Sequence, residues 1–71
     1  MDAKYVLCIN NEGYEVSLER RKIYRVLEEP GEAELDLIRV VDDSGEDYLY
    51  PRRYFVEIAL PRAAEQAFVA A

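Results

Sequence analysis

The chain has 71 residues, of which 51% are hydrophobic and 34% are charged, and its formal net charge is −6. This length is enough for one domain with one small core, and the apolar fraction is too high for a disordered chain. The chain contains no histidine, which removes the commonest acid–base group near neutral pH, the commonest transition-metal ligand and every nucleophile that a histidine would activate. We therefore expect a protein that is not an enzyme and that needs no cofactor or metal.

The cysteine count and the charge also restrict the compartment and the partners. Cys8 is the single cysteine, so an intramolecular disulfide is excluded, and no apolar run approaches the roughly 20 residues of a membrane helix. With no secretory apolar segment at the N-terminus, we expect a reduced, cytoplasmic protein without a membrane partner. Nucleic acid is disfavoured as a partner, because its binding relies on Lys and Arg to release counterions from phosphates.

Short apolar segments alternate with turn residues along the chain, and this spacing is typical of an all-β barrel or sandwich. Tyr14 to Leu18 alternates with period two, which fits either a short strand or the return arm of a long loop. Turns are expected at Gly13, at Pro30-Gly31, and at residues 42–45 with Gly45 in the left-handed conformation. Residues 33–34 are expected in a loop. The predicted strands are residues 5–9, 22–28, 35–41, 48–50 and 55–58.

The C-terminal residues 61–69 break the strand pattern. They are rich in alanine and begin with Pro61, which suits the first position of a helix. A helix of this length is not stable alone. Two alternatives remain open: Phe68 pins a short helix to the rest of the domain, or the tail frays.

The most informative stretch is residues 44–58, because it carries the chain from the fourth strand to the fifth through a corner. Pro51 fixes its own φ angle and lacks an N–H, so it cannot lie inside a central ladder. Arg52 and Arg53 follow, and Tyr54 begins a second β-favouring run. The simplest geometry is a single turn of 3₁₀-helix between two short strands.

Three segments resemble an SH3-like barrel, and the similarity covers about residues 4–58. Residues 15–18 are similar to the family's Glu-Leu-Ser-Phe segment. Residues 22–28 resemble its Asp-Ile-Ile-Glu-Val-Leu-Glu strand, and residues 50–57 resemble Phe-Pro-Ser-Asn-Tyr-Val-Glu. The resemblance implies an all-β fold with a five-stranded SH3-like barrel over residues 1–60. A short tail over residues 61–71 would follow the barrel.

Several residues that bind proline-rich peptides in this family are missing here. The N-terminal aromatic ridge is not found in residues 5–9, and the chain has no tryptophan where one is expected near residues 37–38. Pro51 and Tyr54 remain, while Arg53 replaces the usual asparagine. The chain is therefore similar to the bacterial SH3-like barrels, many of which have no assigned activity. Simple alternation places Leu49 inward, whereas the resemblance turns Tyr50 inward, and we expect the latter.

The tyrosines and arginines are the main candidates for a binding surface. Five of the six tyrosines fit a partly exposed platform for a partner, or a cap on a small core with rings inward and hydroxyls outward. These five are Tyr14, Tyr24, Tyr48, Tyr50 and Tyr54. We expect a protein-binding or assembly module that uses a protein or peptide partner. Tyr54 would be its apolar anchor and the arginines would orient an acidic or carbonyl-rich segment. The expected partner-binding residues are Tyr14, Pro51, Arg52, Arg53 and Tyr54.

The remaining charged groups are expected to be solvated. Fifteen carboxylates can pair with the nine basic residues, so surface ion pairs are favoured over the alternative of an RNA- or ribosome-associated barrel. Asp42, Asp43, Glu46 and Asp47 lack the spacing of a calcium loop and fit a hairpin turn.

Cys8 is expected to act as a small buried hydrophobe. A homodimer is a further alternative, because a free edge strand invites pairing. The basic residues considered for a common face are Arg20, Arg21, Lys22, Arg25, Arg52 and Arg53.

Overall fold

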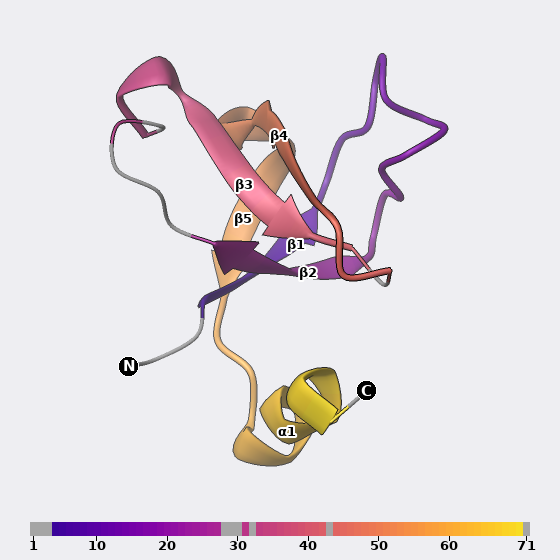
Figure 1. Ribbon diagram of the computed structural model, residues 1–71, viewed down its shortest axis with the longest axis vertical. Coiled ribbons are helices and arrows are strands. Elements are labelled where there is room, and N and C mark those ends of the chain that lie inside the picture. Colours follow the sequence, from indigo (N-terminus) through magenta and orange to yellow (C-terminus); the bar gives the residue numbers. More distant parts are fainter. Residues whose placement is uncertain (1–3, 28–30, 32, 43, 71) are drawn as a thin grey trace.

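The computed structural model describes residues 4–27, 31, 33–42 and 44–70, without the side chains of residues 33 and 68–70 (Figure 1). It is mostly β, with five short strands, two single turns of 3₁₀-helix and one C-terminal α-helix. The strands are β1 (Lys4–Cys8), β2 (Ile23–Leu27), β3 (Leu37–Val41), β4 (Asp47–Pro51) and β5 (Phe55–Ile58). The helical elements are η1 (Ala33–Leu35), η2 (Arg52–Tyr54) and α1 (Arg62–Ala70).

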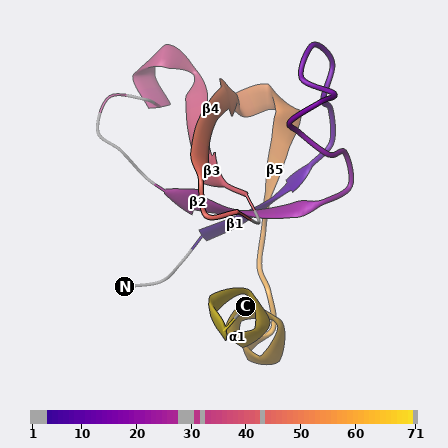
Figure 2. The ribbon, with the colours of Figure 1, turned by 45° about the vertical axis from the view of Figure 1, so that its right-hand side comes forward.

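The five strands form one antiparallel sheet in the order β4-β3-β2-β1-β5. Within the described residues β4 and β5 are the two edges, so the hydrogen-bonded sheet is open. The sheet is strongly curved, and Figure 2 shows its strands arranged around a common centre. The curvature lets both edges contribute side chains to one small core.

The expected strands are confirmed, with differences at their ends. β3 begins at Leu37 rather than at residue 35, because the chain first forms η1 and then passes through Asp36 at φ +59°. The predicted loop at residues 33–34 is therefore a 3₁₀ turn, which needs only one i to i+3 hydrogen bond and no capping side chain. The predicted turn at Pro30 and the end of the second strand at Glu28 lie outside the described residues.

The hairpin between β3 and β4 has the expected glycine geometry. Gly45 lies at φ +87° and its N–H donates to the C=O of Asp42 at 3.0 Å. The N–H of Asp42 in turn donates to the C=O of Glu46 at 2.9 Å. This pattern is a tight turn followed by a left-handed residue, which suits the twist of a β-hairpin.

The corner after β4 is the predicted 3₁₀ turn. Pro51 has φ −59° and ends the strand, and the N–H of Phe55 closes the turn on the C=O of Arg52. The N–H of Arg52 donates to the C=O of Asp36 at 2.9 Å, so the corner is tied to the start of β3. The chain can therefore turn without losing its contact with the sheet.

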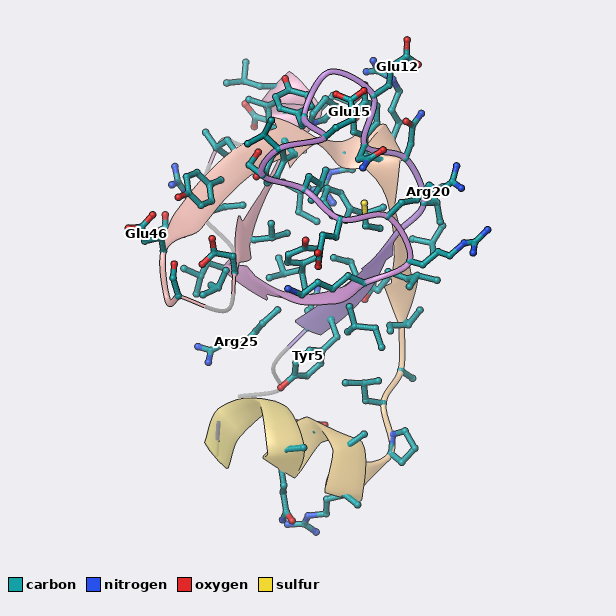
Figure 3. All side chains as sticks on the ribbon, turned by 90° about the vertical axis from the view of Figure 1, so that its right-hand side faces the viewer. Tyr5, Glu12, Glu15, Arg20, Arg25 and Glu46 are labelled. Carbon is teal, nitrogen blue, oxygen red and sulfur yellow. The ribbon has the colours of Figure 1, made fainter. Side chains whose placement is uncertain are left out.

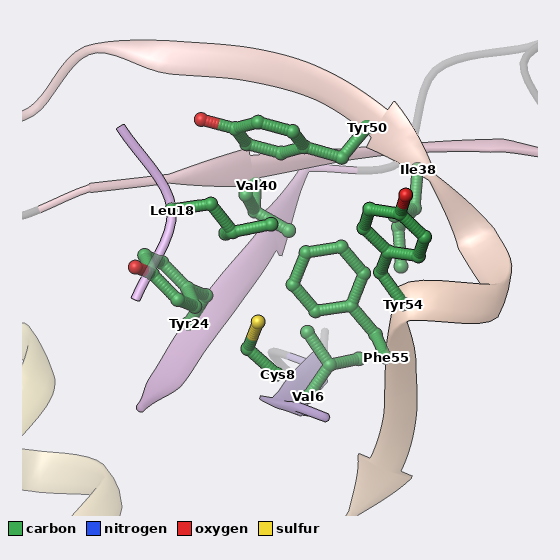
Figure 4. Packing of buried hydrophobic residues seen from close by; sticks show 9 residues of the cluster. All are labelled: Val6, Cys8, Leu18, Tyr24, Ile38, Val40, Tyr50, Tyr54 and Phe55. Atoms are coloured by element: carbon green, nitrogen blue, oxygen red, sulfur yellow. The ribbon is translucent and has the colours of Figure 1, made fainter. Parts of the chain in front are cut away.

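The core lies on the concave face of the sheet, and Figure 4 shows its close packing. Tyr50 is 3% exposed and Leu49 is 38% exposed, which confirms that Tyr50 turns inward. Leu18 is fully buried although it comes from the loop between β1 and β2. The core cluster consists of Val6, Cys8, Leu18, Tyr24, Ile38, Val40, Tyr50, Tyr54 and Phe55.

Helix α1 lies against the opposite face of the sheet. In Figure 3, Tyr5 points from β1 toward α1, and its side chain is buried. The first turn of the helix is closed by a hydrogen bond from the N–H of Glu65 to the C=O of Pro61 at 3.0 Å. The tail thus forms a short helix. The contact expected of Phe68 lies outside the described side chains. No helix in the described residues is long and apolar enough to cross a membrane.

Replacement of Leu18 by alanine should lower the free energy of unfolding by about 2 to 5 kcal/mol, because the change leaves a cavity in a small core. Val16→Ala is the matched control, since Val16 lies in the same loop and is fully exposed, and it should change stability by less than about 0.5 kcal/mol. Urea unfolding followed by circular dichroism measures both. Equal, small effects of the two substitutions would contradict the packing described for Leu18.

Candidate functional site

The long loop between β1 and β2 (residues 9–22) forms one wall of the candidate site. Its residues 14–18 are the return arm of the loop and not a strand. The N–H of Tyr14 donates to the C=O of Asn11 at 2.8 Å, and the N–H of Leu18 donates to the C=O of Tyr14 at 2.8 Å. The amide side chain of Asn11 donates to the C=O of Leu18 at 2.9 Å. The N–H and the C=O of Leu18 are therefore both hydrogen-bonded, so Leu18 can enter the core without a large desolvation cost.

Three buried tyrosines hold this loop from below. Their rings lie in the core and their hydroxyls reach out to loop groups, which matches the expectation of rings inward and hydroxyls outward for these three residues. Each tyrosine comes from a different element, so the loop is tied to β2, β4 and the η2 corner together. The bonds join the Tyr24 hydroxyl to the N–H of Glu19 (2.9 Å), the Tyr50 hydroxyl to Oγ of Ser17 (3.1 Å) and the Tyr54 hydroxyl to the C=O of Glu12 (2.7 Å).

Four tyrosine rings form a continuous row along this wall, and we name Tyr48, Tyr50, Tyr14 and Tyr54 the aromatic row. The Tyr14 ring packs edge-on against Tyr50 at 5.2 Å and against Tyr54 at 6.0 Å between centroids. Tyr48 extends the row from Tyr50 at 6.3 Å. Tyr14 and Tyr48 are about 40% and 37% exposed, whereas the other two rings are buried. The exposed rings are therefore supported by buried ones.

The structure brings Tyr14, Tyr54 and Arg53 together and places the rest of the expected site close by. The Arg53 guanidinium lies 5.2 Å from the centroid of the Tyr54 ring. Arg52 is exposed and its guanidinium donates to the C=O of Leu37 at 3.2 Å, while Pro51 is half-buried. Tyr54 is only 7% exposed and its hydroxyl is bonded to the loop. The apolar surface expected of Tyr54 is therefore offered by Tyr14.

Three of the basic residues, Arg20, Arg21 and Lys22, line one pocket on the long loop, whereas Arg25 lies apart from them. Figure 3 shows Arg20 on the long loop and Arg25 on the other side of the molecule. Lys22 pairs with the carboxylate of Glu19 at 3.4 Å, and its Nζ lies 5.3 Å from the centre of the Tyr24 ring. This arrangement matches solvated charges and surface ion pairs more closely than a phosphate-binding face.

A polar pocket of about 550 Å³ opens at the base of the long loop. Its lining includes the buried Leu18 and charges of both signs. Two of these charges, on Glu19 and Lys22, form an ion pair, so the pocket does not present one strong charge. The lining residues are Asn11, Glu15, Leu18, Glu19, Arg20, Arg21 and Lys22.

Acidic residues lie beside the aromatic row at its β4 end. The Tyr48 hydroxyl donates to the carboxylate of Glu46, and this hydrogen bond raises the pKa of Tyr48 to about 12. The Ser44 hydroxyl donates to Asp42 and lowers the pKa of that carboxyl. No group of three or more potential metal ligands occurs among the residues that the structure places. We name Asp42, Ser44, Gly45, Glu46 and Asp47 the acidic hairpin. Hydrogen bonds between its own residues hold it in place.

Cys8 is fully buried in β1 and behaves as a small core residue. Its thiol donates to the C=O of Asn10 at 3.2 Å, and burial raises the pKa of the thiol. A raised pKa disfavours the thiolate, which is the reactive form. The position of Cys8 matches the expectation of a buried hydrophobe.

Comparison with protein-family models, with curated proteins and with solved structures found no match to this chain.

Sequence reasoning counted Tyr48 among the tyrosines of a possible platform but left it out of the expected partner-binding residues, and it missed Leu18 as a core residue. Tyr48 lies two positions before Tyr50, so the two side chains share a face of β4, and the inward turn of Tyr50 was the available signal for placing Tyr48. No comparable signal marked Leu18, because its burial depends on how the loop folds back over the sheet.

Removal of the Glu46 carboxylate should bring the pKa of Tyr48 back toward about 10, the ordinary value for tyrosine, since the hydroxyl then loses its charged acceptor. An NMR titration of isotope-labelled tyrosine rings in the Glu46→Ala variant measures this shift. Because the pKa is raised in the folded state, the stabilising contribution of this group is complete below about pH 10 and is lost as the pH rises through about 12.

The matched control for this titration is Glu15→Ala, which removes an exposed carboxylate from the long loop and should leave the pKa of Tyr48 raised. A Tyr48 ring that titrates near pH 10 in the unaltered protein would contradict the hydrogen bond to Glu46.

Proposed function

We propose that this chain is a small SH3-like barrel that acts in the cytoplasm as a non-enzymatic protein-binding or assembly module. Its surface for the partner is built from Tyr14 and the Arg52-Arg53 corner. The supporting observation is that Tyr14 is about 40% exposed while its ring packs against two buried tyrosines. An exposed aromatic ring held rigidly offers contact area at a low entropic cost.

The barrel part of the proposal is supported by the order and curvature of the strands. Five antiparallel strands wrap around one core, and a proline-led 3₁₀ turn stands before the last strand. These features support the resemblance to the SH3-like family that the three sequence segments suggest. The missing tryptophan argues for a partner other than the usual proline-rich peptide.

The chemistry of the surface favours a protein segment with carboxylates or exposed carbonyl groups. Arg53 lies over the Tyr54 ring, and Arg52 is held at Leu37. Both arginines are exposed, so their remaining N–H groups can donate to acceptors on a partner. Tyr14 supplies the apolar contact, and the two arginines set the orientation of the segment.

The double substitution Tyr14→Ala and Arg53→Ala should weaken binding of the natural partner by about tenfold or more, because aromatic and arginine residues dominate the energy of protein interfaces. Affinity capture from the lysate of the native host, followed by titration of the captured protein, measures the loss. Both side chains are at the surface, so the double variant should remain folded.

The matched control is Val16→Ala with Arg20→Ala, which removes an exposed apolar residue and an exposed arginine from elsewhere on the long loop. A partner that is retained by the unaltered and control proteins and lost by the double variant supports the surface. A partner that binds all three proteins with equal affinity would contradict the proposed binding surface.

A further inference from the structure

β4 is an edge strand, so half of its backbone groups face away from β3. Hydrogen bonds at the two ends of the β3–β4 pair show which residues of β4 direct their backbone groups away from β3. The N–H of Asp42 bonds to the C=O of Glu46 at one end, and the N–H of Arg52 bonds to the C=O of Asp36 at the other. Bonded and non-bonded residues alternate along an antiparallel pair. The even-numbered residues of β4 therefore bond to β3.

The odd-numbered residues Asp47 and Leu49 consequently direct their N–H and C=O groups away from the sheet. Within the described part of the chain, none of the turn, loop or cap hydrogen bonds uses these four groups. Asp47 and Leu49 are both exposed. Pro51, which has no N–H, marks the end of this free edge. The edge is short but offers two donors and two acceptors in the spacing that an added strand requires.

The charge around this edge is negative. Glu46 and Asp47 are exposed beside it, and Asp42 closes the hairpin. Arg39 bonds to Asp47 at 2.6 Å, and Lys22 lies close enough to Asp42 to help lower the pKa of its carboxyl, so these two cations offset part of the negative charge. Like charges would oppose pairing of β4 with the same edge of a second copy. A strand with basic side chains would meet the opposite charge instead.

We propose that the free edge of β4 accepts an extended, basic segment of a partner protein as an added strand. The backbone groups of Asp47 and Leu49 would supply the affinity, and the acidic residues would select for lysine or arginine on the segment. Tyr48, which is partly exposed, lies on the concave face of the same strand and would contact an apolar side chain of the added strand.

The other edge of the sheet is less suited to this role. The N–H of Ile9 bonds to the C=O of Tyr54, and the alternation along β5 therefore turns Glu57 outward. The N–H of Phe55 is already used by the C=O of Arg52. β5 thus offers one outward donor, the N–H of Glu57, where β4 offers two. Glu57 provides the matched control position for Leu49.

The test uses the whole protein and a capped seven-residue peptide of alternating lysine and valine. The Leu49→Pro variant should bind this peptide about tenfold more weakly or worse, because proline removes an outward N–H and blocks the edge. The ladder to β3 does not use that N–H, so the sheet can remain. Glu57→Pro makes the same change on β5 and should bind like the unaltered protein. Isothermal titration at low salt measures all three.

A second measurement does not depend on the folding of the variants. In the unaltered protein, saturation with the peptide should slow amide hydrogen exchange at Asp47 and Leu49. No slowing at these two amides, or equal binding by Leu49→Pro, would overturn the proposal. Equal binding of a glutamate–valine peptide would overturn the preference for a basic segment, and a dimer that Leu49→Pro disrupts would assign the edge to a second copy instead.

This edge is separate from the surface of the proposed function. The variant with Tyr14→Ala and Arg53→Ala leaves Asp47 and Leu49 unaltered, so it should bind the lysine–valine peptide with unchanged affinity. If the variant does so and still retains its natural partner, the proposed function fails while the β4 edge stands. If Leu49→Pro has no effect on the peptide, the edge fails alone.

Discussion

The burial of Leu18, on a loop that three tyrosine hydroxyls hold by hydrogen bonds, is the constraint on which the rest of the structure depends. A sheet of five short strands cannot enclose a core by itself, and here the long loop supplies the missing side. Burial of one leucine contributes about 2 kcal/mol, and each tyrosine hydrogen bond contributes about 1 kcal/mol. These amounts are a large share of the stability of a small domain. The loop is thus part of the core and not an appendage to it.

This constraint also determines the candidate surface. Because the hydroxyls of Tyr50 and Tyr54 are bonded to the loop, their rings stand in fixed positions, and the ring of Tyr14 packs edge-on between them. An exposed side chain that is already ordered loses little entropy when a partner binds. The same hydrogen bonds that stabilise the fold therefore prepare the surface for recognition. The β4 edge has a different basis, since it depends on the backbone of Asp47 and Leu49 and on the acidic hairpin.

Local sequence was sufficient to predict the strands and the corner. The run from Phe55 to Ile58 matched its strand at both ends, because Pro51 cannot continue a ladder and the following residues favour extended backbone. Gly45 was assigned its left-handed conformation for a similarly local reason. Tyr50 was placed correctly through the resemblance to the SH3-like family, where simple alternation would have chosen Leu49.

The features that local sequence did not predict depend on contacts between distant residues. Leu18 is buried because the long loop folds back over residues from β2, β4 and the corner, and the period-two pattern of residues 14–18 carries no information on that path. Tyr54 was expected to be an exposed anchor, yet its hydroxyl reaches Glu12, which lies 42 positions earlier in the chain. The left-handed backbone of Asp36 was also not expected, since glycine is the usual residue there.

Amide hydrogen exchange tests the integration of the long loop most directly. If the loop is part of the core, the N–H of Leu18 and the N–H of Glu19 should exchange only when the whole domain unfolds, with the same free energy as the β1 amide of Cys8. Exchange of the loop amides at rates close to those of an unfolded chain, while Cys8 remains protected, would show that the loop opens independently and that the sheet is stable without it.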